Sequence, residues 1–107
     1  METIVCLGHM PTRIGQVVIE SLSYADGNPA VTLTLTETGE EFLTLSVNLP
    51  QDAHTLDEDE FFVKTWSENE YFIQDILATG LFEDTGRRVS TGWVEAQVWR
   101  ILKEVAK

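Results

Sequence analysis

A regular alternation of apolar residues and threonines is the feature that most limits how this chain can fold. Residues 31–36 read Val-Thr-Leu-Thr-Leu-Thr. Successive side chains of a β-strand point to opposite faces of the sheet. One face of this strand is therefore apolar, and the other is a row of threonines, as expected for a sheet with one solvated side. The segment is predicted to be a strand that covers a core.

The segments on either side of this strand are predicted to pair with it. The dipeptides Asp-Gly at 26–27 and Thr-Gly at 38–39 suit tight turns. Residues 17–22 and 42–49 show period-two patterns of their own. Pro50 ends the second of them because proline has no amide hydrogen for the ladder. The pattern predicts an antiparallel meander of three strands.

A helix is predicted in residues 67–80. Ser67 and Glu70 have the spacing of a capping box, in which each side chain accepts a hydrogen bond from the other residue's amide. Four apolar residues then share one helical face: Phe72, Ile73, Ile76 and Leu77. Gly80 suits the left-handed residue that follows a helix.

The last third of the chain returns to strand character. Thr-Gly dipeptides at 85–86 and 91–92 indicate turns or bulges, and residues 93–101 alternate in the manner of a strand. The resulting order, β-β-β-α-β-β, predicts an α+β fold with one helix packed on an antiparallel sheet. A length of 107 residues allows one domain, which we expect to span residues 1–107.

Acidic residues are concentrated in one third of the chain. Residues 52–84 hold one base, Lys64, and ten acids: Asp52, Asp57, Glu58, Asp59, Glu60, Glu68, Glu70, Asp75, Glu83 and Asp84. The whole chain has a formal net charge of −11 at pH 7. Such a protein repels nucleic acid and anionic membranes, and it attracts proteins built to hold nucleic acid. We therefore expect a basic, nucleic-acid-binding partner, and neither nucleic acid nor membrane directly.

The remaining composition predicts a cytoplasmic protein. No apolar run approaches the roughly 20 residues that span a bilayer. The chain starts Met-Glu-Thr and lacks the basic start of a signal peptide. Cys6 is the single cysteine, so no internal disulfide forms, which agrees with a reducing compartment. Its apolar neighbours predict a buried, inert thiol.

The four consecutive acids Asp57–Glu60 allow three interpretations. They lie in residues 51–60, which lack periodicity and are predicted to form a surface loop. The first is a metal site, because carboxylates are ligands of divalent cations. An EF-hand loop, however, has acids at alternating positions and a central glycine, whereas these acids are contiguous and no glycine intervenes. The loop then serves solubility, or it forms a recognition face for a basic partner. No structural role is predicted for these four side chains.

Catalytic, metal and cofactor sites are not expected. His9, His54 and Cys6 lack the paired spacing of a zinc site, and no acid is placed to orient a cysteine–histidine pair. The glycines at 80, 86 and 92 do not form a nucleotide fingerprint. We therefore expect a protein that is not an enzyme and has no cofactor.

Two further features have both a structural and a functional interpretation. Arg87-Arg88 suits binding of a phosphate or carboxylate, but pairing with Glu83, Asp84 or the acidic loop is favoured. Trp66 lies outside any clear strand, next to the predicted helix start. It is the tryptophan expected to be partly exposed, where it would anchor an interface.

Several short motifs suggest a family. Residues 24–31 and 43–50 read Tyr-Ala-Asp-Gly-Asn-Pro-Ala-Val and Leu-Thr-Leu-Ser-Val-Asn-Leu-Pro. With Gly80-Leu81, Thr85-Gly86-Arg87 and Gly92-Trp93, they resemble a family of short acidic proteins carried by bacteriophages, plasmids and conjugative elements. Residues 96–99, Ala-Gln-Val-Trp, depart from it, because the family more often has a proline and a tyrosine there. The resemblance implies a small accessory protein of a mobile element.

Charge and family resemblance together favour one function. It is inhibition of a host defence complex of the CRISPR-Cas type, by occupying its nucleic-acid-binding surface as a DNA mimic. The residues expected to bind this partner are nine acids and one tryptophan: Asp57, Glu58, Asp59, Glu60, Trp66, Glu68, Glu70, Asp75, Glu83 and Asp84. The alternative is an adaptor or regulatory protein, monomer or homodimer, that binds through apolar contacts at Trp66 and the sheet face.

Overall fold

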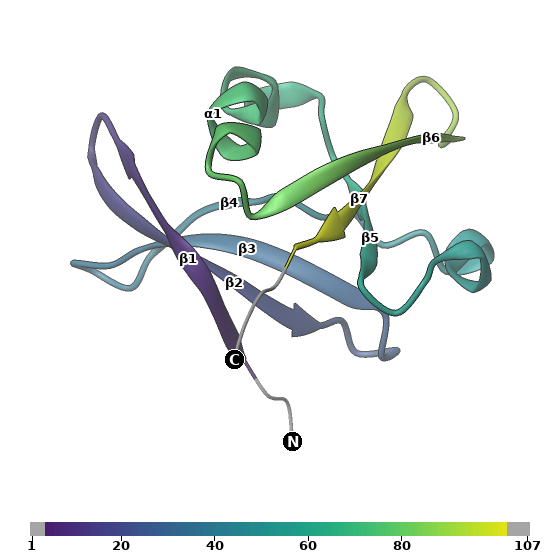
Figure 1. Ribbon diagram of the computed structural model, residues 1–107, viewed down its shortest axis with the longest axis horizontal. Helices are drawn as coiled ribbons and strands as arrows, with labels where there is room; N and C mark the ends of the chain where they lie inside the picture. The colour runs from purple at the N-terminus through teal and green to yellow at the C-terminus, as the bar shows by residue number, and fades with distance from the viewer. Residues whose placement is uncertain (1–3, 103–107) are drawn as a thin grey trace.

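A computed structural model describes residues 4–102, which form two antiparallel sheets (Figure 1). The first sheet has the strand order β1-β2-β3-β4. Its strands follow each other directly along the chain: β1 Val5–Thr12, β2 Gly15–Ser23, β3 Pro29–Leu35 and β4 Glu41–Thr44. The chain therefore builds this sheet as a series of hairpins.

The second sheet has the order β5-β7-β6, so that the last strand lies in the middle. A short helix precedes its first strand, two short helices separate its first two strands, and a turn joins the last two. In chain order the elements are: the 3₁₀-helix η1 Pro50–Thr55, β5 Glu60–Val63, the 3₁₀-helix η2 Ser67–Tyr71, α1 Ile73–Ala78, β6 Phe82–Ser90 and β7 Glu95–Ile101. In Figure 1, α1 and η1 lie toward different ends of the molecule.

The two sheets are joined where the chain leaves β4. Ser46 forms an antiparallel bridge with Val63 of β5. The amide of Lys64 donates to the carbonyl of Leu45 at 2.8 Å, and the amide of Val47 donates to the carbonyl of Phe62 at 3.1 Å. The second sheet thus continues from the first through one short segment.

The core lies between the two sheets and takes side chains from both. Val17, Ile19 and Leu33 of the first sheet are fully buried, as are Phe61 and Trp99 of the second. Phe61 packs edge-on against Trp99, with ring centroids 6.4 Å apart. Edge-to-face aromatic pairs of this kind add about 1 kcal/mol beyond their burial. The two sheets therefore share one apolar core.

The predicted α+β class is consistent with this structure, which is mostly antiparallel strand with little helix. The turn predictions at 26–27 and 38–39 are confirmed, and both glycines have positive φ, 88° and 78°. Residues 31–36 fall in and just after β3, with Val31 and Leu33 buried. The predicted strand order differs, because the sequence pattern does not reveal β1 or β5 and the strand predicted at 42–49 ends at Thr44.

β1 escapes prediction because Gly8 and Pro11 interrupt its pattern. A Cβ atom on Gly8 would lie 2.7 Å from Leu81 Cδ1, so the glycine permits a close approach of this strand to the chain before β6. Cys6 on the same strand is exposed, which corrects the prediction of a buried thiol. β1 is an edge strand with one ladder partner, and Met10 is its one buried residue.

The predicted capping box does not form. Ser67 has a positive φ of 64°, and its hydroxyl donates to the carboxylate of Glu68 at 2.7 Å instead of accepting from the Glu70 amide. Residues 67–71 form a 3₁₀-helix, and the α-helix that follows has only six residues. The prediction at Gly80 is confirmed, with φ 78° beyond the end of α1.

Asn69 explains why the turn adopts this form. It is fully buried, and its Nδ2 donates to the carbonyls of Thr44 at 2.8 Å and Lys64 at 2.9 Å. These carbonyls end β4 and follow β5, so one amide group holds η2 against the junction of the two sheets. This long-range contact outweighs the local capping preference of Ser67 and Glu70.

Asn69→Asp should destabilise the protein by about 2–3 kcal/mol at neutral pH. The substitution keeps the shape but removes both donated hydrogen bonds and places a carboxylate beside two carbonyl oxygens. Urea unfolding followed by circular dichroism measures the change, with Asn69→Ala as the comparison. An Asn69→Asp variant as stable as the parent would show that these bonds do not hold the junction.

Candidate partner-binding surface

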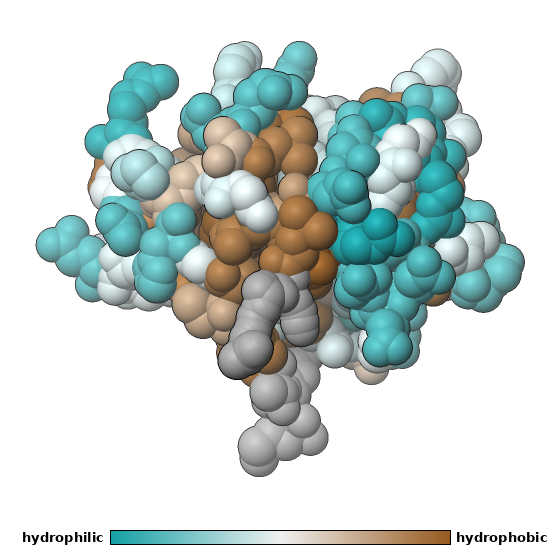
Figure 2. Space-filling view, in the orientation of Figure 1, coloured by the Kyte–Doolittle hydropathy of each residue, from teal (hydrophilic) through white to brown (hydrophobic). Residues whose placement is uncertain are grey.

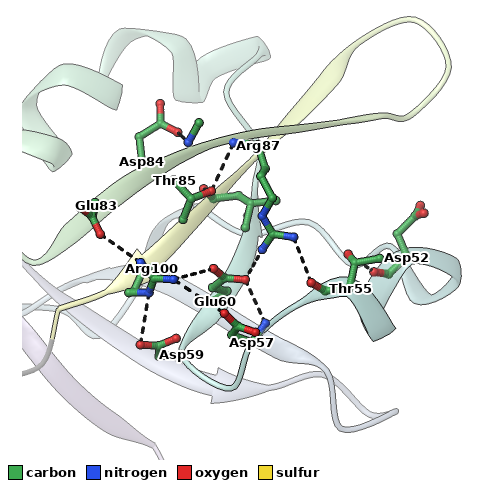
Figure 3. Close-up of polar contacts among 12 residues, drawn as sticks. Asp52, Thr55, Asp57, Asp59, Glu60, Glu83, Asp84, Thr85, Arg87 and Arg100 are labelled. Atoms are coloured by element: carbon green, nitrogen blue, oxygen red, sulfur yellow. Dashed lines mark hydrogen bonds and ion pairs between the residues drawn. The ribbon is translucent and has the colours of Figure 1, made fainter.

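Glu60 is the centre of an ion-pair cluster and not a free acid of a surface loop. It begins β5, and its side chain is only 2% exposed. Its Oε1 accepts from the Arg87 guanidinium and from the Asp57 amide, and its Oε2 accepts from Arg100 Nη2 at 3.0 Å. Figure 3 shows the carboxylate between the two guanidinium groups. Burial of a carboxylate requires such partners.

Arg100 collects further acids around the same point. It lies on the central strand β7, directly opposite Glu60 of β5 and Glu83 of β6. Its guanidinium is 3.2 Å from Glu83 Oε1, 3.5 Å from Asp59 Oδ2 and 3.7 Å from Asp57 Oδ2. Opposite charges on directly paired strands stabilise the sheet. Three of the four residues 57–60 therefore pair with arginine, which corrects the prediction that they have no structural role.

The Arg87-Arg88 pair has the structural role that the sequence favoured. Arg87 binds Glu60, and its Nη1 also donates to the carbonyl of Thr55 at 3.0 Å. Arg88 binds Asp84 through two hydrogen bonds of 2.9 and 3.0 Å. The hydrogen bonds from Arg88 lower the pKa of Asp84, although partial burial acts in the opposite direction.

The remaining predicted acids are exposed, and none of them forms an ion pair within residues 4–102. We call them the unpaired acids: Glu58, Glu68, Glu70 and Asp75. Three of the four lie on η2 and α1, whereas the paired acids lie around β5, β6 and β7. The hydrogen bond from Ser67 lowers the pKa of Glu68, which stays ionised at neutral pH. The structure thus divides the predicted face into two groups on different elements.

The tryptophans differ from one another in exposure. Trp66 is partly buried, as expected, and packs against a small cluster formed by Phe62, Ala96 and Val98. Trp99 is fully buried, whereas Trp93 is fully exposed in the turn between β6 and β7. A Thr-Gly turn next to an aromatic residue is the only sequence signal for the position of Trp93. It is the larger apolar surface available to a partner.

One hollow of about 380 Å³ lies beside the ion-pair cluster, between Thr55, Glu83 and Arg100. Its charged groups bind one another (Figure 3). Within residues 4–102, no three histidine, cysteine or acidic side chains are grouped so as to hold a metal ion. No helix in that range is long and apolar enough to cross a membrane.

No protein-family model, curated protein or solved structure matches this chain. The resemblance to accessory proteins of mobile elements therefore stays a prediction. In the structure, its two longest motifs contact each other. The Tyr24 hydroxyl lies 2.9 Å from Ser46 Oγ, and Asn48 Nδ2 donates to Asp26 Oδ2 at 2.9 Å. These motif residues hold the β2–β3 turn against the segment that joins the two sheets.

The Asp84–Arg88 pair should contribute about 0.5–1 kcal/mol at pH 7, because both side chains are partly exposed. The pKa of Asp84 is lowered in the folded state, so its contribution is fully present above the unfolded value of about 3.9 and is lost as pH falls through the folded value. Urea unfolding of the parent and Asp84→Asn should show a difference at pH 7 that shrinks toward pH 3. A difference that stays constant with pH would contradict this assignment.

Proposed function

We propose that this protein is a non-enzymatic, cytoplasmic inhibitor that binds a basic protein surface built to hold nucleic acid. The observation that supports this proposal most is the division of the acids into those paired with arginine and the unpaired acids. Three arginines are occupied by the protein's own acids, while the unpaired acids extend into solvent. A partner therefore meets carboxylates whose attraction is not cancelled locally.

Competition with nucleic acid is the proposed mechanism. Exposed carboxylates on a rigid scaffold take the place of phosphates in a basic groove, and the partner then cannot bind its nucleic acid. We further propose, on the family resemblance, that the partner is a host defence complex of the CRISPR-Cas type. The paired acids, with four carboxylates around Arg87 and Arg100, keep an excess of negative charge of their own.

A second candidate function is that of an adaptor that binds through apolar contacts. The full exposure of Trp93 favours it, since tryptophan is a frequent anchor of protein interfaces. Binding of this kind depends weakly on salt and is lost in Trp93→Ala, whereas Trp66→Ala mainly disturbs the packing around Phe62.

Capture followed by competition tests the proposal. The immobilised protein is used to capture a partner from host lysate at about 50 mM salt, and the purified partner is titrated with labelled duplex DNA. We expect the protein and the duplex to exclude each other, and affinity to fall about tenfold or more at 500 mM salt. Simultaneous binding of both, or affinity independent of salt, would contradict the proposal.

Two variants test which surface of the protein binds the partner. Replacement of the unpaired acids by amides, Glu58→Gln, Glu68→Gln, Glu70→Gln and Asp75→Asn, should weaken binding without loss of stability. Trp93→Ala serves as the comparison and should leave salt-dependent binding in place. The reverse result, loss with Trp93→Ala alone, would support the adaptor.

A further inference from the structure

An apolar groove lies between the β1–β2 hairpin and the η2–α1 segment, away from the ion-pair cluster around Glu60. It has a volume of about 740 Å³. Its apolar lining comes from both of these segments and from β4: Met10, Ile14, Phe42, Tyr71 and Phe72. Figure 1 shows the hairpin tip and α1 on the same side of the molecule. In Figure 2, apolar surface gathers between β1 and α1, whereas polar surface covers the side of η1 and β7.

The groove combines packed aromatic side chains with apolar side chains that are exposed to solvent. Phe42 and Phe72 pack edge-on at its base, with ring centroids 5.0 Å apart, and Met10 is buried below them. Ile14 and Tyr71 remain 68% and 81% exposed. Large apolar side chains that stand together in water on an otherwise packed surface indicate a binding site. Neither residue lies in the core, so core packing does not explain why these two exposed positions are apolar.

The charges around the groove decide which partner fits. Asp75 lines it, and the same elements carry Glu41 beside Phe42 and Glu70 beside Tyr71. These three acids are exposed, and none forms an ion pair within the described part of the chain. Arg13 is the one base in the lining. A second copy with a net charge of −11 would be repelled here, whereas a cationic segment would be attracted.

We propose that this groove binds a short cationic amphipathic helix of the partner protein. The apolar side of the helix inserts between Ile14 and Tyr71, and its lysines or arginines face Glu41, Glu70 and Asp75. Helix-in-groove recognition uses this combination of apolar anchors and flanking charge. The proposal rests on the proposed function in one respect, the basic character of the partner, and it adds where and through which element the partner binds.

Two synthetic peptides of identical composition provide the test. One is a leucine–lysine peptide with leucines at helical spacing, and the other is a scrambled isomer without an apolar face. Because the net charges are equal, non-specific attraction is the same for both. We expect the amphipathic peptide to bind at least about tenfold more tightly in isothermal titration calorimetry. Its NMR perturbations should centre on Ile14 and Tyr71.

Two exposed substitutions and one control complete the experiment. Ile14→Ser and Tyr71→Ser should abolish the preference for the amphipathic peptide, and thermal melts check that the variants stay folded. Ile4→Ser replaces an apolar residue that is also exposed but does not line the groove, and it should keep the preference. Equal binding of the two peptides, or a preference that survives both serine variants, would overturn the proposal.

Other outcomes identify another occupant or separate the two proposals. Concentration-dependent dimerisation that Ile14→Ser abolishes would assign the groove to a second copy and overturn the peptide site. If the peptide does not bind but the protein still competes with duplex DNA for its partner, only the groove proposal is refuted. If the peptide binds at Ile14 and Tyr71 but the protein does not compete with duplex DNA, the proposed competition is refuted and the groove proposal stands.

Discussion

The second sheet depends on one buried carboxylate. Glu60 lies on β5, its partners Arg100 and Arg87 lie on β7 and β6, and the three strands form the whole of that sheet. A buried charge is tolerated only when its partners and hydrogen bonds are complete. In the register between β5 and β7, Glu60 faces Arg100, so this ion pair supports the pairing of the two strands. Arg100 also pairs with three further acids, whose side chains stay 44–73% exposed.

This arrangement changes how the acidic third of the chain should be understood. The run Asp57–Glu60 looks like a uniform surface loop in the sequence, yet only Glu58 is both exposed and without an arginine partner among the described residues. The acids on η2 and α1, among which Glu70 was predicted to close a capping box, are free of arginine partners among the described residues. The apolar groove lies beside that second group, so charge and apolar contact are available together.

The sequence predicted those elements whose signals are local. The Asp26-Gly27 and Thr38-Gly39 turns, the threonine face of β3 and the end of α1 at Gly80 each follow from neighbouring residues. The failures depend on contacts across the chain. Asn69 displaces the capping box by binding Thr44 and Lys64, and Glu60 meets arginines 27 and 40 positions away. Periodicity and motif spacing carry no signal for such pairs.

The unfolding free energies of Glu60→Gln and Glu58→Gln test this account most directly. The two residues are two positions apart in the chain, and both substitutions remove one negative charge and keep the side chain's shape. The account predicts a loss of about 2–3 kcal/mol for Glu60→Gln, because Arg87 and Arg100 lose their common buried partner, and a change within about 0.5 kcal/mol for Glu58→Gln. Equal effects of the two substitutions in urea unfolding at pH 7 would contradict the division of the acids into paired and unpaired groups.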